Sequence, residues 1–84
     1  MSEYTIKGLR FVQTCSFSPE QYDVYHRFHK VGYLRLRHGH FRCEDGGGNI
    51  IWESDPANCD GCFNSEEQRM KYLSESADLI KNCL

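Results

Sequence analysis

The sequence lacks the motifs that would name an activity. No Gly-x-Ser-x-Gly element surrounds a serine, and the glycine run at 46–48 is not followed by the lysine and hydroxyl residue of a phosphate-binding loop. The chain has no internal repeat and no linker long enough to separate two domains. With 84 residues it is expected to form a single domain, 1–84, around one core. We therefore expect no catalytic activity.

Membrane-spanning and export segments are missing as well. No apolar run approaches the roughly 18–20 residues of a membrane span, and the amino-terminal "MSEYTIKGLR" has no signal-peptide pattern. These absences predict a cytoplasmic protein with no membrane partner. Five cysteines are many for this length, but their odd number and the missing export signal argue against a disulfide framework. Reduced thiols or metal ligands are the expected forms.

Neither sign of charge dominates the chain. Ten basic and twelve acidic residues give a net charge of −2. The basic residues gather between Arg27 and Arg42, and acidic residues dominate after Glu44. The molecule as a whole is expected to repel nucleic acid weakly, so that only a local patch could attract it.

Four segments have the composition of β-strands. They are rich in β-branched and aromatic residues and are separated by turn signals such as "EDGGGN". Their predicted bounds are 4–15, 21–27, 31–43 and 50–54. The short connections between them favour hairpins, which predicts a four-stranded antiparallel meander sheet.

A helix is predicted over 66–82. Apolar residues there recur at three- and four-residue steps and form one stripe: Met70, Leu73, Ala77, Ile80 and Leu84. Ser65 followed by Gln68 is a capping-box arrangement. The fold class is therefore expected to be α+β, with this carboxy-terminal helix packed on one face of the sheet.

The segment "YLRLRHGHFRCE", 33–44, can be divided by strand alternation. With a turn at 28–30, Val24 opposes Leu34 on one face, and Asp23 opposes Arg35 on the other. The face that meets the core would then be Leu34, Leu36, His38, His40 and Arg42. The outer face would be Tyr33, Arg35, Arg37, Phe41 and Cys43. A bulge at Gly39 would exchange the last positions.

The outer face is the preferred binding surface. It combines aromatic rings with guanidinium groups: Tyr25, Arg27, Tyr33, Arg35 and Arg37. Such residues anchor protein interfaces, and they also stack on bases and pair with phosphates. A protein partner is favoured over single-stranded nucleic acid because the net charge is negative. The bland alternative is a solvated face, and self-association through exposed sheet edges is a further option.

A structural zinc site is the alternative function. His40 and Cys43, followed after fifteen residues by Cys59 and Cys62, have the spacing of a four-ligand site. Residues three apart on a strand point to opposite faces, however, so the first pair would need either a bulge at Gly39 or a kinked strand end. Unliganded thiols are the simpler expectation, with no cofactor. A redox role for "CDGC" is disfavoured because no helix begins at its first cysteine.

Three segments carry a resemblance: "YDVY" at 22–25, "VGYLRLRHGHFR" at 31–42 and "DGCF" at 60–63. From Pro19 to Leu73 the chain resembles small, uncharacterised single-domain proteins of bacterial, phage and mobile-element genomes. That resemblance implies an accessory protein and no particular activity. The hairpin "YDVY…KVGYLRLR" is also similar to the central hairpin of GNAT acetyltransferases. The pyrophosphate-binding loop of that family is missing, so acetyl-CoA binding is not implied.

Overall fold

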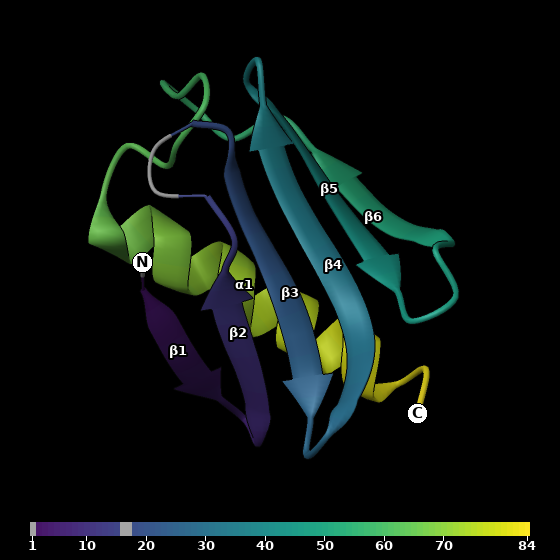
Figure 1. Cartoon of the computed structure of the whole chain (residues 1–84). Coiled ribbons are helices and arrows are strands. Elements are labelled where there is room, and N and C mark those ends of the chain that lie inside the picture. The colour runs from purple at the N-terminus through teal and green to yellow at the C-terminus, as the bar shows by residue number, and fades with distance from the viewer. Residues whose placement is uncertain (1, 16–17) are drawn as a thin grey trace.

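Residues 2–15 and 18–84, which a computed structural model describes, form six β-strands and one α-helix (Figure 1). In chain order they are β1 Glu3–Ile6, β2 Leu9–Gln13, β3 Glu20–His26, β4 His29–Arg37, β5 His40–Asp45, β6 Ile50–Ser54 and α1 Glu66–Lys81. Each strand pairs antiparallel with the next, so the strand order in the sheet follows the chain. The predicted α+β class is confirmed. The prediction of four strands is wrong.

Two of the predicted strands are in fact hairpins. Lys7 and Gly8 have φ of 53° and 83°, and His38 and Gly39 have φ of 53° and 74°. Two consecutive residues with positive φ form the tight turn whose twist matches the flanking antiparallel strands. Segment 4–15 therefore folds into β1 and β2, and segment 31–43 into β4 and β5. Gly39 belongs to a turn and does not form the bulge that the sequence had suggested.

The turn at 38–39 also changes which side chains reach the core. Leu36 pairs with Phe41 across it, and both are buried. Residues that pair across two strands point to the same side of the sheet. Phe41 and Cys43 pair with the buried Leu36 and Leu34, so both point inward. The predictions that placed them on the outer face are wrong. So is the predicted core position of His38, His40 and Arg42, since none of these is buried.

The observed pairing of β3 with β4 differs from the predicted pairing by two residues. The turn comprises Arg27 and Phe28, and an irregularity follows Val24, so that Val24 lies opposite Gly32 rather than Leu34. A displacement of two residues keeps every side chain on its face. The predicted inward positions of Tyr22, Val24, Leu34 and Leu36 are therefore confirmed.

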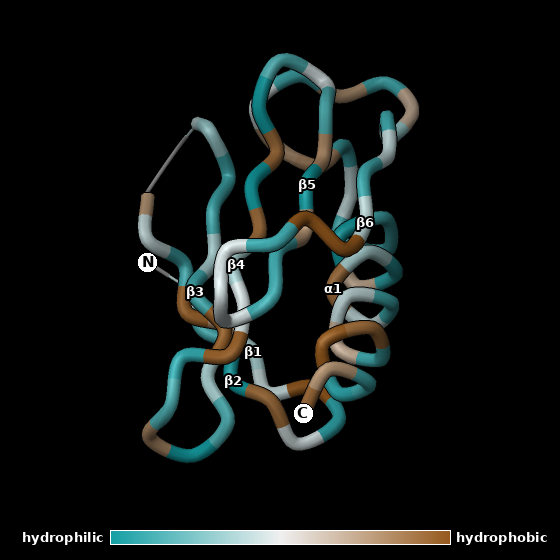
Figure 2. The backbone as a smooth tube through the Cα atoms, turned by 90° about the vertical axis from the view of Figure 1, so that its right-hand side faces the viewer, coloured by the Kyte–Doolittle hydropathy of each residue, from teal (hydrophilic) through white to brown (hydrophobic). Residues whose placement is uncertain are grey.

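Helix α1 begins and packs as predicted. The Ser65 hydroxyl accepts a hydrogen bond from Gln68 N at 3.0 Å, which caps the first turn. The helix lies across one face of the sheet as a second layer (Figure 2). Ile80 of the helix packs against Gly32 of β4, where a Cβ atom would lie 2.5 Å from Ile80 Cδ1. Leu84, the last member of the predicted stripe, lies beyond the helix and is exposed.

The core lies between the sheet and α1. Its buried apolar residues are Ile6, Leu9, Phe11, Tyr22, Val24, Leu34, Leu36, Phe41, Cys43, Phe63, Leu73, Ala77 and Ile80. At the β6 side, Trp52 stacks on Tyr72 of α1 with ring centres 5.1 Å apart and planes 12° apart. In the part of the chain that is described, no helix is both long and apolar enough to cross a bilayer. The strand residues that point to the opposite surface of the sheet are half-buried or exposed.

Candidate interaction surface

The outer face is the sheet surface opposite α1. Four predicted site residues lie on it: Tyr25 on β3 and Tyr33, Arg35 and Arg37 on β4. Each β4 member alternates with buried residues of that strand, which fixes the side to which it points. Arg27 occupies the β3–β4 turn at the edge of this surface. The structure thus places the four strand residues on one side of the sheet, with Arg27 and Arg37 at opposite ends of β4.

Both tyrosine rings on the outer face lie beneath cations. The Arg10 guanidinium lies 5.1 Å from the ring centre of Tyr25, and the Lys30 ammonium lies 5.5 Å from that of Tyr33. The Tyr33 hydroxyl also donates a hydrogen bond to the side-chain oxygen of Gln21. The aromatic groups are therefore held in place, with positive charge above them.

Several cations of this surface are neutralised by neighbouring carboxylates. The nitrogen–oxygen distances are 3.0 Å for Arg10–Glu3, 3.0 Å for Lys30–Asp23 and 2.8 Å for Arg42–Glu44. Asp23 had been expected to lie opposite Arg35, but it lies opposite Tyr33 and forms its ion pair with Lys30. Arg35 loses its predicted partner as a result.

Three arginines remain without an ion pair to any residue in 2–15 or 18–84: Arg27, Arg35 and Arg37. Arg35 lies directly across the strand pair from Arg42. Glu44 neutralises Arg42, so Arg35 and Arg37 are the two arginines of β4 that lack a carboxylate partner among the described residues.

His40 lies at one end of the outer face and is held by two carboxylates. Its Nδ1 lies 2.8 Å from Asp55 Oδ1, and its Nε2 lies 2.8 Å from Glu53 Oε1. These hydrogen bonds, first that to Asp55 and then that to Glu53, raise the pKa of the imidazole. With both ring nitrogens occupied, His40 has no free nitrogen for a metal ion.

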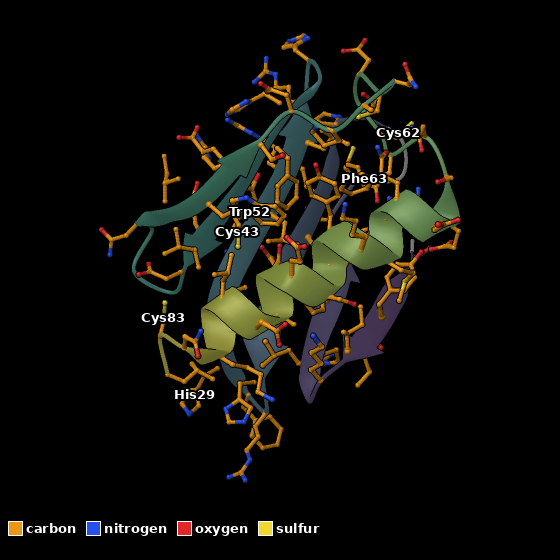
Figure 3. The ribbon with its side chains drawn as sticks, turned by 180° about the vertical axis from the view of Figure 1, so that it is seen from behind. His29, Cys43, Trp52, Cys62, Phe63 and Cys83 are labelled. Atoms are coloured by element: carbon orange, nitrogen blue, oxygen red, sulfur yellow. The ribbon has the colours of Figure 1, made fainter. Side chains whose placement is uncertain are left out.

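The remaining residues of the zinc hypothesis lie elsewhere. Cys43 is buried on the opposite face of β5 from His40, and burial raises the pKa of its thiol to about 11. The Cys59 thiol donates to Pro56 O at 3.2 Å, and Cys62 is exposed (Figure 3). Within 2–15 and 18–84, no group of three or more metal-binding side chains is found. The arrangement gives the zinc hypothesis no support.

A buried ion pair was missed by sequence analysis. Glu20, only 2% exposed, accepts hydrogen bonds from Arg69 Nε at 2.6 Å, Phe63 N at 3.1 Å and the Tyr22 hydroxyl. Burial acts to raise the pKa of Glu20, but hydrogen bonds from Arg69, Tyr22 and Phe63 outweigh it and the pKa is lowered. Because its acceptors are satisfied, this cluster ties β3 to α1.

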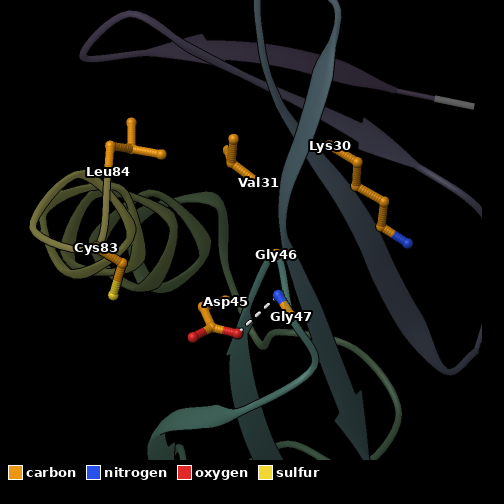
Figure 4. Close-up of a pocket in the computed structure, with 7 residues that line it drawn as sticks. All are labelled: Lys30, Val31, Asp45, Gly46, Gly47, Cys83 and Leu84. Carbon is orange, nitrogen blue, oxygen red and sulfur yellow. Dashed lines mark hydrogen bonds between the residues drawn. The ribbon is translucent and has the colours of Figure 1, made fainter.

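A hollow of about 270 Å³ opens between the start of β4, the β5–β6 turn and the end of the chain (Figure 4). The Asp45 carboxylate at its edge accepts hydrogen bonds from the backbone N–H groups of Gly47 and Asn49, each at 2.9 Å. These bonds shape the turn and, Asn49 first, lower the pKa of Asp45. The carboxylate at the edge of this hollow is therefore already engaged by the backbone of the turn.

No family model, curated protein or solved structure matches the chain. The class that the fold defines is a small α+β domain whose antiparallel meander sheet is covered by a helix on one face and open on the other.

Proposed function

We propose that this protein is a non-catalytic binding module that uses the outer face to hold an acidic surface of a partner protein. The contacts would be made by Tyr25, Tyr33, Arg35 and Arg37, with Arg27 at the edge. The observation that carries the proposal is the charge pattern on β4. Arg35 and Arg37 have no carboxylate partner among the described residues, although the neighbouring cations do.

A protein partner agrees better with this surface than single-stranded nucleic acid does. Tyrosine and arginine are enriched among the residues that dominate protein interfaces. Base stacking needs free aromatic faces, whereas Tyr25 and Tyr33 each have a cation over the ring. From the resemblance to proteins of phage and mobile elements, we infer an accessory or inhibitory role toward the partner.

The test is capture of partners from the native host with matched variants. The double variant Arg35→Glu, Arg37→Glu reverses the charge on the outer face, and Lys71→Glu reverses an exposed charge on α1. We expect the same protein to be retained by the wild type and by Lys71→Glu, and to be lost with the double variant at an unchanged unfolding temperature. Equal retention by all three forms would contradict the proposal.

A second experiment tests whether the outer face binds nucleic acid instead of a protein. Binding of a fluorescent 20-nucleotide oligothymidine is measured by anisotropy at low and moderate salt. Phosphate contacts give an affinity that falls steeply as salt rises. We expect no binding at moderate salt, and strong salt-sensitive binding that the double variant abolishes would assign the same face to nucleic acid instead.

A further inference from the structure

The tip of the β3–β4 hairpin has an unusual composition for a tight turn. Phe28 is 95% exposed, the largest exposure of any large apolar residue described. Arg27 beside it adopts φ of 59°, a left-handed conformation that glycine or asparagine adopts at less cost. His26 and His29 pair across the strands immediately behind the turn. Neither the strained arginine nor the solvated ring stabilises the hairpin, which points to a role in contact.

A complementary hollow lies on another part of the molecule. About 370 Å³ in volume, it opens between the edge strand β6 and α1 and is lined by Trp52, Glu75, Asp78 and Leu79. Trp52 and Leu79 supply apolar surface, while Glu75 and Asp78 supply negative charge. Asp78 forms an ion pair with Lys7, with 2.7 Å between Asp78 Oδ2 and Lys7 Nζ, but Glu75 has no ion pair with any described residue. In Figure 3, Trp52 lies beside α1, whereas His29 marks the hairpin tip at the far end of the molecule.

We propose that the hairpin tip of one molecule docks into this hollow on a second copy of the chain. Phe28 would pack against Trp52 and Leu79, and Arg27 would lie beside Glu75. The match is one of chemistry and size: an aromatic ring meets an apolar floor, and a cation meets an acidic rim. A cavity of about 150 Å³ holds a benzene molecule, so the hollow has room for the ring. This inference uses none of the β4 arginines and shares only Arg27 with the proposed function, so self-association and partner binding can be tested separately.

The charge of the hollow favours the hairpin tip over a second hollow as its occupant. Two hollows facing each other would bring one unpaired Glu75 toward the other, and like charges oppose such an approach. The tip presents the opposite charge. Because the tip and the hollow are different surfaces, the contact is heterologous and extends to rings or open chains of copies. One anchoring side chain gives weak association, with a dissociation constant on the order of 0.1–1 mM.

Sedimentation velocity between about 10 µM and 1 mM tests whether the purified protein self-associates. Trp52 is the single tryptophan of the sequence, so its emission reports on the hollow. We expect the mean mass to rise with concentration and the Trp52 emission to shift to the blue. Phe28→Ala removes the anchor, and Glu75→Arg reverses the rim. Both residues are exposed, and each variant alone is expected to stay monomeric with an unchanged unfolding temperature.

Mixing the two variants is the decisive step. The Phe28→Ala protein keeps an intact hollow, and the Glu75→Arg protein keeps an intact tip, so the mixture should form pairs that cannot grow further. The double variant Arg27→Glu, Glu75→Arg restores opposite charges and should recover at least part of the self-association. A wild type that stays monomeric at 1 mM, self-association that survives Phe28→Ala, or a mixture that forms no pairs would each overturn the proposal.

Discussion

Glu20 is a carboxylate held almost entirely out of water by the groups that bond to it. Replacing Arg69 with methionine would leave that charge buried without its cation. Breaking a buried pair in this way costs about 3 kcal/mol of unfolding free energy. We expect a loss of this size in urea denaturation of Arg69→Met. Lys71→Met, an exposed change on the same helix, should cost less than about 0.5 kcal/mol, and equal losses would show that the pair is not the cause.

The lowered pKa of Glu20 makes stability depend on pH. The folded protein holds the carboxylate ionised more strongly than the unfolded chain, whose glutamate pKa is about 4.3. The ionised Glu20 carboxylate therefore contributes fully to the unfolding free energy above about pH 4.3, and this contribution is lost as the pH falls through the pKa of Glu20 in the folded protein. We expect the unfolding free energy of the wild type to fall more steeply below about pH 4.5 than that of Glu20→Gln. Denaturation curves collected at several pH values compare the two slopes, and parallel profiles would contradict the assignment.

The Cys43 thiol should be the slowest of the described cysteines to react. It is fully buried, and its pKa is raised to about 11, whereas Cys62 and Cys83 are exposed. We expect iodoacetamide at pH 8 to label the exposed pair quickly and Cys43 only after unfolding, as read by peptide mass spectrometry. Adding EDTA should not alter the pattern. Rapid labelling of Cys43 once EDTA is present would instead favour the zinc hypothesis.

At the scale of elements, local signals explain what the sequence could predict. The cap at Ser65 and the stripe on α1 depend on residues a few positions apart; the cap is confirmed, and so is the stripe except for Leu84. The alternation of Tyr22 and Val24 with polar neighbours correctly identified the buried side of β3. Each of these features can be read within one element, because its period is fixed by backbone geometry.

The predictions that were wrong concern features that depend on pairing between elements. Lys7 and His38 adopt positive φ although neither is glycine, and only the partner strands make those turns favourable. Once the turn at 38–39 was missed, the inward positions of Phe41 and Cys43 were assigned to the wrong face. The Glu20–Arg69 pair joins residues 49 positions apart, so no local pattern could reveal it.

The close approach of α1 to the sheet gives a test at this scale. In Gly32→Ala, the new methyl group would lie 2.5 Å from Ile80 Cδ1 and 3.0 Å from the Glu44 carbonyl oxygen. Overpacking of this kind costs about 1–3 kcal/mol, and thermal or urea unfolding measures it. Gly47→Ala is the matched control, because its nearest contact would be an ordinary 3.4 Å. An unaffected Gly32→Ala protein would mean that the helix lies farther from the sheet.

At the scale of the whole molecule, one sheet supports two different surfaces. The helix covers the inner face and completes the core, whereas the outer face carries charged residues, including Arg35 and Arg37, which have no ion pair among the described residues. The negative net charge does not prevent this, because at physiological salt charges more than about 8–10 Å apart are largely screened from one another. A local basic surface can therefore meet an acidic partner on a molecule that is acidic overall.

The most direct test of the outer face is the dissociation constant of the captured partner, measured with purified proteins by calorimetry. We predict that Arg35→Glu, Arg37→Glu weakens binding at least tenfold, since each rim charge contributes modestly and reversal adds repulsion. Lys71→Glu should leave the constant unchanged within about twofold. A dissociation constant that is the same for wild type and double variant, with both proteins folded, would contradict the assignment of the outer face as the binding surface.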